Sequence, residues 1–203
     1  MSLLITGFEP FNGETLNPSQ LLAQKLARSR GLDVEILPVS YKRSFEVLRD
    51  RLESGRYKGL LSIGQAAGRS KVCLERVALN LEDADLADAD LVTKVESAID
   101  LNGPTAHLNP LPLRQYVREF KMRGRPVEIS TSAGAYVCNS LYYQTFRWME
   151  KNPRALAFQL FVHVPFLPEQ AERKPGLVPS LEMSEMEASL SELIDLLIER
   201  LPS

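Results

Sequence analysis

Segments with the pattern of buried strands alternate with segments typical of amphipathic helices along most of this chain. Short apolar runs that stop at a glycine, such as residues 3–6 and 60–63, are typical of buried strands. Asn17 and Pro18 then have the types preferred at a helix N-cap and at the first helical position. This alternation favours an α/β sandwich with a largely parallel central sheet.

The same reasoning extends over the rest of the sequence. We expect further strands at residues 34–39, 72–80, 127–131 and 156–164, and further helices at residues 44–54, 112–123, 138–151 and 184–201. Ser44 is the expected N-cap of one helix, and Ser184 with Glu187 is the expected capping box of the last. Residues 81–108 are the least regular part and predict a loop or hairpin insertion that covers a site, whereas residues 169–184 predict a surface loop.

Length, charge and cysteine content narrow the class of protein. A chain of 203 residues fits one domain spanning residues 1–203. A formal net charge of -2 gives no reason to expect a nucleic-acid partner. We see no signal peptide and no apolar run long enough to cross a bilayer, so no membrane partner is expected. Two cysteines suggest a reducing, cytoplasmic setting, which suits a free catalytic thiol.

Cys138 lies where an expected strand gives way to an expected helix. Unpaired N–H groups and the positive end of the helix dipole would favour a thiolate there. The small residues Ser132, Gly134 and Ala135 precede it, so the backbone can turn tightly and its N–H groups could hold an oxyanion. The alternative is a buried structural cysteine, which is the commoner role of a lone cysteine.

His163 closes the most apolar expected strand. Ligands of open α/β sheets bind beyond the carboxyl ends of strands, so this imidazole could meet a helix N-terminus at the same edge. A hydrogen-bonded core histidine is the alternative. His107, the other histidine, has no such context and is interpreted as a loop residue.

Glu75 falls on the same strand parity as the apolar residues Cys73, Val77 and Leu79. A carboxylate on an apolar face must be paired, hydrogen-bonded or neutralised. Orienting a histidine would be one reason to keep it there, and a pairing with Arg69 or Arg76 is the alternative.

Two further motifs carry weaker signals. The segment 64–69 follows a strand but lacks the lysine of a phosphate-binding loop, so it is a substrate or structural loop. The acidic residues between positions 82 and 90 lack the spacing of a calcium loop and are expected to form a solvated loop. With two histidines and two cysteines, neither a zinc site nor another metal or cofactor is predicted.

Taken in order, several segments resemble the pyroglutamyl peptidase I (pyrrolidone carboxyl peptidase) family of cysteine peptidases. They cover most of the chain: residues 6–11 (TGFEPF), 17–19 (NPS), 64–69 (GQAAGR), 75–80 (ERVALN), 133–139 (AGAYVCN) and 163–170 (HVPFLPEQ).

The resemblance implies a three-layer α/β/α sandwich with a largely parallel, mixed sheet. It implies that Cys138 is the nucleophile, His163 the base and Glu75 the third member of a triad. The activity it implies is removal of an N-terminal pyroglutamyl residue from small peptides by a protein that often forms homodimers or homotetramers.

The resemblance also implies the residues that contact substrate. Phe8 and Phe11 are expected to help enclose the lactam ring, which suits a neutral, flat and partly apolar group. Asn17 and Gln65, in the matching segments, are the other expected substrate contacts.

One departure from the family pattern concerns the loop after Glu75. Asp85 stands where the family usually has an arginine, which reverses the local charge. Two alternatives follow from it: the same thiol chemistry with a shifted acyl specificity, or a catalytically silent peptide-binding homologue. Asn12 stands where a glycine is usual, which is a smaller change.

Overall fold

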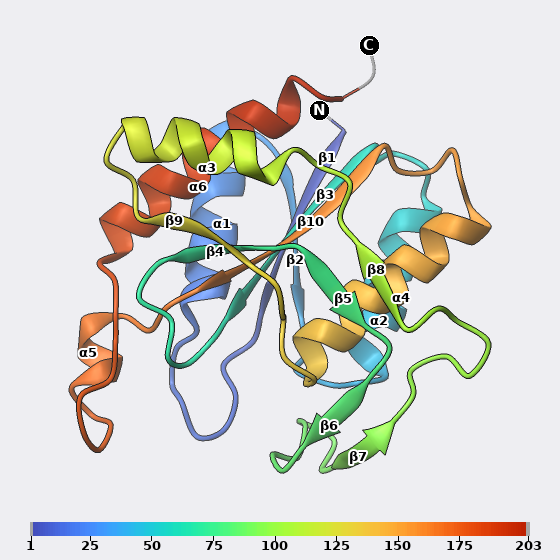
Figure 1. Cartoon of the computed structure of the whole chain (residues 1–203), viewed down its shortest axis with the longest axis horizontal. Coiled ribbons are helices and arrows are strands. Elements are labelled where there is room, and N and C mark those ends of the chain that lie inside the picture. Colours follow the sequence, from blue (N-terminus) through green and yellow to red (C-terminus); the bar gives the residue numbers. More distant parts are fainter. Residues whose placement is uncertain (1, 202–203) are drawn as a thin grey trace.

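The computed structural model describes residues 2–201 and has a central sheet covered by helices on both faces (Figure 1). The six strands of the sheet are β1 (Leu3–Phe8), β2 (Asp33–Leu37), β3 (Gly59–Gln65), β4 (Val72–Glu75), β9 (Val127–Ser130) and β10 (Phe158–Val164). Their order is β2-β1-β3-β10-β4-β9. Neighbouring strands are parallel except β10 and β4, which are antiparallel. The predicted sandwich with a mixed, largely parallel sheet is confirmed.

Two apolar cores separate the sheet from its helices. On one face lie α1 (Pro18–Arg30), α3 (Leu113–Met122) and α6 (Met183–Ile198), and on the other lie α2 (Arg43–Glu53) and α4 (Val137–Lys151). The short helix α5 (Pro168–Ala171) follows β10. Within residues 2–201, no helix has both the length and the apolar character needed to cross a bilayer.

Residues 81–108 contain a hairpin, as predicted for this irregular stretch. Its strands are β6 (Glu82–Ala84) and β7 (Lys94–Ser97), which pair antiparallel. The hairpin extends beyond the N-terminus of α4 at the bottom of Figure 1. A second small sheet joins β5 (Val77–Leu79) to β8 (Ala106–Leu108) beside it.

Helix α1 has the caps that its sequence predicts. The Oδ1 atom of Asn17 accepts a hydrogen bond from the backbone N–H of Ser19 at 3.0 Å. Pro18 occupies the first turn, where its missing N–H costs nothing. Gly31 ends the helix in the left-handed region, with φ of 61°, and its N–H donates to the carbonyl of Ala27.

Two other predicted caps are wrong. Ser44 is buried inside α2, and the hydroxyl of Ser40 accepts from the N–H of Arg43 at 3.0 Å instead. Ser184 lies inside α6, which begins at Met183 and has no side-chain cap. In both cases the helix starts before the serine, so its hydroxyl is too far along to reach the unpaired N–H groups.

The predicted strand over residues 72–80 is broken into two. At Arg76 the chain leaves the main sheet: its N–H donates to the carbonyl of Ser130 at 2.7 Å, and its carbonyl accepts from Asn109 at 2.8 Å. Glu75 is therefore the last residue of β4. The alternation of side chains between the two faces of the sheet holds up to Glu75. It does not continue into β5, which is a separate strand.

Replacing Asn17 by Ala should lower the free energy of unfolding by about 1 kcal/mol, because α1 loses its N-cap. The amide of Asn17 also donates to the carbonyl of Glu9 at 3.0 Å, so the preceding loop is tied to the same side chain. Urea unfolding measures the change. Asn17→Asp is the control, since it keeps the capping oxygen and loses only the bond to Glu9. An alanine variant as stable as the parent would contradict this role.

Candidate active site

Glu75 and His163 meet inside the protein. Strands β4 and β10 pair so that Cys73 lies opposite His163, and Glu75, two residues further along β4, is on the same face of the sheet. The Oε1 atom of Glu75 lies 2.8 Å from Nδ1 of His163, and the two side chains are 0% and 4% exposed. A buried carboxylate beside apolar neighbours is thus explained by its histidine partner.

Both alternative partners of Glu75 can now be placed. A guanidinium nitrogen of Arg69 lies 3.7 Å from Oε1 and also donates to Ser130 Oγ and the carbonyl of Ser132. The guanidinium of Arg76 instead donates to the carbonyls of Asn109 and Leu111. Arg69 therefore supplies the positive charge near the Glu75–His163 pair, and Arg76 does not.

The carboxylate partner fixes the role of each imidazole nitrogen. When Nδ1–H donates to Glu75, Nε2 is left as a neutral base that can take up a proton. The backbone of Glu75 is held too, because its carbonyl accepts from the hydroxyl of Tyr142 at 2.9 Å. That hydroxyl in turn accepts from the amide of Asn109 at 2.7 Å. The imidazole is thus positioned by buried groups on three separate segments.

Cys138 is the second residue of α4. The helix is preceded by Tyr136 in an extended conformation without a side-chain cap, so the first N–H groups of α4 remain available to a ligand. Across from the sulfur lies Gly64 of β3. A Cβ atom on Gly64 would lie 2.9 Å from Cys138 Sγ and 2.9 Å from the ring of Phe161. Only glycine leaves room for the thiol at this point.

Gly64 is also the strand partner of His163 in the β3–β10 pairing. One residue of β3 therefore adjoins both the sulfur of Cys138 and the segment that carries the imidazole. From the sequence, Gly64 is the residue that stops a strand and opens the loop 64–69. The need for close approach across the sheet is a tertiary constraint that local patterns do not carry.

The thiol is not the lowered-pKa group that its place at a helix N-terminus predicts. Burial raises the pKa of Cys138 to about 12, the negative charge of Glu75 raises it further, and its own backbone N–H opposes them. Loss of solvation outweighs the helix dipole here. Burial and the charge of Glu75 therefore favour the neutral thiol over an isolated thiolate.

A cavity of about 390 Å³ opens beside these groups. Its walls come from the loop after β3, the loop before α4 and the end of β10. They comprise residues Gln65, Ala66, Ala67, Gly68, Arg69, Ala133, Gly134, Tyr136, Cys138 and His163. The cavity thus joins a thiol, an imidazole base and unpaired N–H groups, which are the components of acyl transfer through sulfur.

The four predicted substrate contacts lie at different depths. Gln65 lines the cavity, and its Oε1 atom accepts from the amide of Gln170 at 3.1 Å. Phe11 packs against Tyr136 with ring centroids 6.2 Å apart, so it supports the cavity wall. Phe8 is buried behind the site against Phe161, and Asn17 caps α1.

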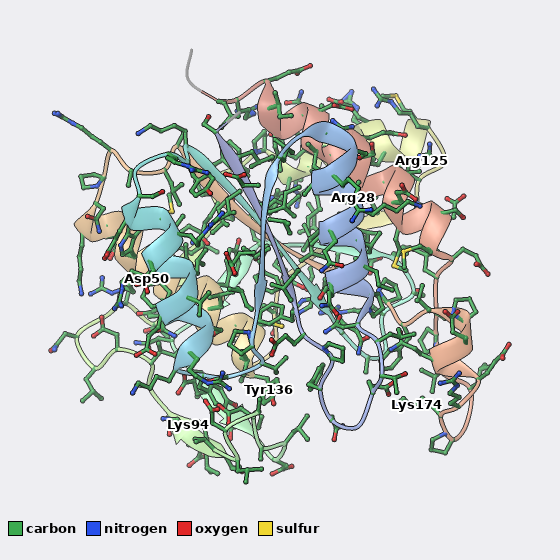
Figure 2. The ribbon with its side chains drawn as sticks, turned by 180° about the vertical axis from the view of Figure 1, so that it is seen from behind. Arg28, Asp50, Lys94, Arg125, Tyr136 and Lys174 are labelled. Atoms are coloured by element: carbon green, nitrogen blue, oxygen red, sulfur yellow. The ribbon has the colours of Figure 1, made fainter. Side chains whose placement is uncertain are left out.

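The hairpin is fastened to the loop that precedes Cys138. The hydroxyl of Tyr136 donates to the carbonyl of Ala87 at 2.9 Å, and the N–H of Asp83 donates to the carbonyl of Ala135 at 2.9 Å. Figure 2 labels Lys94, which belongs to the hairpin, and Tyr136, which precedes α4, in its lower part. Asp85 itself is exposed and has no ion pair within residues 2–201.

The sequence predicts a solvated acidic loop here, and this prediction is wrong for two of its residues. Asp88 is buried and accepts from the backbone N–H groups of Tyr41, Asp90 and Val92, each at 2.9 Å. Glu82 is buried as well and accepts from the hydroxyl of Ser140 at 2.5 Å. These carboxylates tie the hairpin to the body of the protein. The described residues 2–201 contain no grouping of side chains suited to a metal ion.

Two smaller features complete the site's surroundings. His107 is not a simple loop residue: it belongs to β8, and its ring stacks on Phe146 at 5.1 Å. Asn12 has a φ of 53°, in the left-handed region that glycine adopts readily and asparagine tolerates. The exchange of glycine for asparagine at this position is therefore compatible with the turn.

Known proteins match this chain over most of its length. The pattern of the family described as pyroglutamyl peptidase matches residues 1–200. The pyrrolidone-carboxylate peptidase of Bacillus cereus (strain ATCC 10987 / NRS 248) is 36% identical over 187 residues, which cover 90% of this chain and 86% of that protein. The crystal structure of pyrrolidone carboxyl peptidase from Fervidobacterium islandicum AW-1 has a TM-score of 0.93 at 35% identity, with 98% of this chain and 99% of that chain covered.

Pyroglutamyl peptidase I from Bacillus amyloliquefaciens gives a TM-score of 0.86 at 33% identity and covers 93% of this chain and 92% of its own. Sequence pattern, relatives and solved structures thus agree over nearly the whole length. This chain belongs to the pyroglutamyl peptidase family.

Proposed function

We propose that this protein is a cysteine peptidase that removes N-terminal pyroglutamyl residues from peptides. The observation that carries the proposal is the buried 2.8 Å contact between Glu75 and His163 at a cavity that Cys138 also lines. A carboxylate that orients an imidazole beside a thiol is the arrangement of nucleophilic catalysis. The names of the family and of its relatives supply the substrate class.

The reaction follows from the positions of these groups. His163 takes the proton of Cys138 as the sulfur attacks the pyroglutamyl carbonyl carbon. The resulting oxyanion is held by the unpaired N–H groups at the start of α4. The C–N bond then breaks while His163 gives its proton to the leaving amine. Water, deprotonated by His163, hydrolyses the thioester, and the proton returns to the sulfur of Cys138.

The raised pKa of Cys138 sets the timing of proton transfer. Since burial and the charge of Glu75 disfavour a free thiolate, negative charge on sulfur develops only with a protonated His163 beside it. The carboxylate of Glu75 then stabilises the imidazolium at 2.8 Å. Glu75 thus opposes an isolated thiolate and favours the thiolate–imidazolium pair.

The cavity suits a small neutral ring. A volume of about 390 Å³ lies near the lower end of typical ligand pockets. Gln65 offers an amide to the polar edge of the lactam, and Tyr136, supported by Phe11, offers an aromatic wall. We propose that Phe8 and Asn17 contribute from behind, by fixing β1 and the loop that carries Phe11.

The setting of the protein is a further part of the proposal. Cys73 and Cys138 are both free thiols, which fits a reducing cytoplasm. One domain spanning residues 1–203 agrees with a family match over residues 1–200. A homodimer or homotetramer is expected from the family, and the exposed apolar side chains Leu91, Val95 and Leu101 offer contact surface.

A shifted acyl specificity at Asp85 finds no support in the relatives, because they carry the same peptidase name.

Replacing Cys138 by Ala or by Ser should abolish turnover of a pyroglutamyl coumarin amide, because the reaction loses its sulfur nucleophile. Initial rates with matched protein concentrations measure the loss, and circular dichroism checks that each variant is folded. Cys73→Ser is the matched control, since that thiol is buried on β4 and should be dispensable for the reaction. A Cys138→Ala variant with parental turnover would refute the assignment.

The neutral thiol also predicts a dependence of stability on pH. The pKa of Cys138 rises from 9.0 to about 12 on folding, so the folded state holds the proton more tightly. Its contribution to stability is complete below about pH 9 and is lost as the pH rises toward about 12, at about 1.4 kcal/mol per pH unit.

The comparison of the parent with Cys138→Ser isolates this effect, because Cys73 is present in both proteins. Between about pH 8 and pH 10.5, the parent should lose about 2 kcal/mol more unfolding free energy than the serine variant. Urea unfolding at several pH values provides the measurement. An equal pH response in both proteins would mean that the thiol is not held neutral.

A further inference from the structure

A second and larger hollow lies outside the cavity just described. It runs between α3 and the edge strand β9, which face the viewer in Figure 1, and has a volume of about 1400 Å³. We call it the α3–β9 groove. Its lining includes the apolar residues Val117, Val127 and Ile129 and the basic residues Lys71, Arg76, Arg114, Arg118 and Lys121.

The groove concentrates positive charge on a protein whose formal net charge is -2. Arg114, Arg118 and Lys121 are spaced i, i+4 and i+7, so they form one stripe along α3. None of the three takes part in an ion pair within residues 2–201, whereas the acidic member of the lining, Glu128, is paired with Lys71 at 3.2 Å. The free charge of the groove is therefore cationic.

Strand β9 gives the groove an open backbone edge. It pairs with β4 on one side and is the last strand of the sheet as described over residues 2–201. An extended peptide can add to such an edge through its own backbone, while its side chains reach the flanking helix. The surface thus combines a backbone edge with basic side chains that complement an acidic extended chain.

The groove and the catalytic cavity are neighbours along the chain at two points. Thr131 lines the groove and Ala133 lines the cavity; likewise Lys71 lines the groove and Arg69 lines the cavity. Two residues of extended chain span at most about 7 Å. The two hollows lie on opposite faces of the sheet, so a peptide whose first residue occupies the cavity reaches the groove by passing around the edge strand β9 with the residues that follow the scissile bond.

We propose that the α3–β9 groove binds the acidic leaving portion of pyroglutamyl peptides. This inference rests on the proposed function and deepens it, because it names the class of peptide that the protein prefers. Acidic side chains from the third residue onward meet Arg114, Arg118 and Lys121 after the first residue has entered the cavity. Selectivity arises from charge and not from the lactam, which all these substrates share.

The test compares peptides of pyroglutamate and alanine followed by three glutamates, three glutamines or three lysines. A triple variant, Arg114→Gln, Arg118→Gln and Lys121→Gln, removes the stripe and keeps good helix formers. The parent should show kcat/KM about 3- to 20-fold higher for the glutamate peptide than for the lysine peptide, given what exposed charge pairs contribute. The preference should vanish in the variant and shrink as salt rises from about 0.05 to 0.5 M.

The control is a second triple variant with the same charge change at exposed residues elsewhere: Arg28→Gln, Lys151→Gln and Arg154→Gln. Arg28 lies on α1, on the side of the molecule seen in Figure 2. This variant should keep the glutamate preference. Both variants should hydrolyse a pyroglutamyl coumarin amide at the parental rate, because that substrate has no peptide to place in the groove.

Equal kcat/KM for the glutamate and lysine peptides in the parent would overturn the proposal, as would equal losses in the two triple variants. If the coumarin amide itself is not hydrolysed, the proposed function fails instead. Binding to the groove is then measured by fluorescence anisotropy with a labelled acidic peptide that lacks pyroglutamate. Binding that the Arg114, Arg118 and Lys121 changes abolish supports the groove, whereas tighter binding of a DNA oligonucleotide would overturn its assignment to peptides.

Discussion

The buried contact between Glu75 and His163 is the interaction on which the site depends. A buried carboxylate is costly without partners, and here Oε1 of Glu75 lies beside the imidazole and the guanidinium of Arg69. The same contact decides which imidazole nitrogen faces the cavity, and the charge of Glu75 adds to burial in raising the pKa of the Cys138 thiol. One pair of side chains thus sets both the orientation and the tautomer of the imidazole.

The sheet topology is what makes this contact possible. Strand β10 lies at the point where the sheet changes from parallel to antiparallel, between β3 and β4. On one side β10 pairs with β3, where Gly64 leaves room for the sulfur of Cys138. On the other side it pairs with β4, which carries Glu75. The helix that carries Cys138 starts beside Gly64. Residues separated by many positions in sequence therefore meet over a central strand.

The sequence allowed prediction of the features that local chemistry encodes. The α/β alternation, the cap at Asn17 and the anomaly of Glu75 on an apolar face follow from residue type and periodicity, and the structure agrees with each. The roles of Gly64, Asp88 and Ser40 could not be predicted in this way. Gly64 and Asp88 depend on partners from distant segments, and Ser40 depends on where α2 begins. A local sequence pattern shows neither of these.

The thiol shows the limit of a purely local electrostatic argument. Position at a helix N-terminus predicts a lowered pKa for Cys138, and the dipole of α4 does act on it. Burial against β3 and the charge of Glu75 reverse the direction. Desolvation depends on the packed fold, so the balance between these effects could be judged only once the surroundings of the sulfur were known.

The most direct test of this account is the turnover of a Glu75→Gln variant with a pyroglutamyl amide. We predict that kcat falls by about 10²- to 10⁴-fold while the protein stays folded, because glutamine keeps the shape but cannot stabilise the imidazolium. The control is Glu128→Gln, which removes a carboxylate from the neighbouring strand β9 and should leave turnover unchanged. Parental turnover in Glu75→Gln would contradict the central claim that the buried carboxylate makes His163 the base.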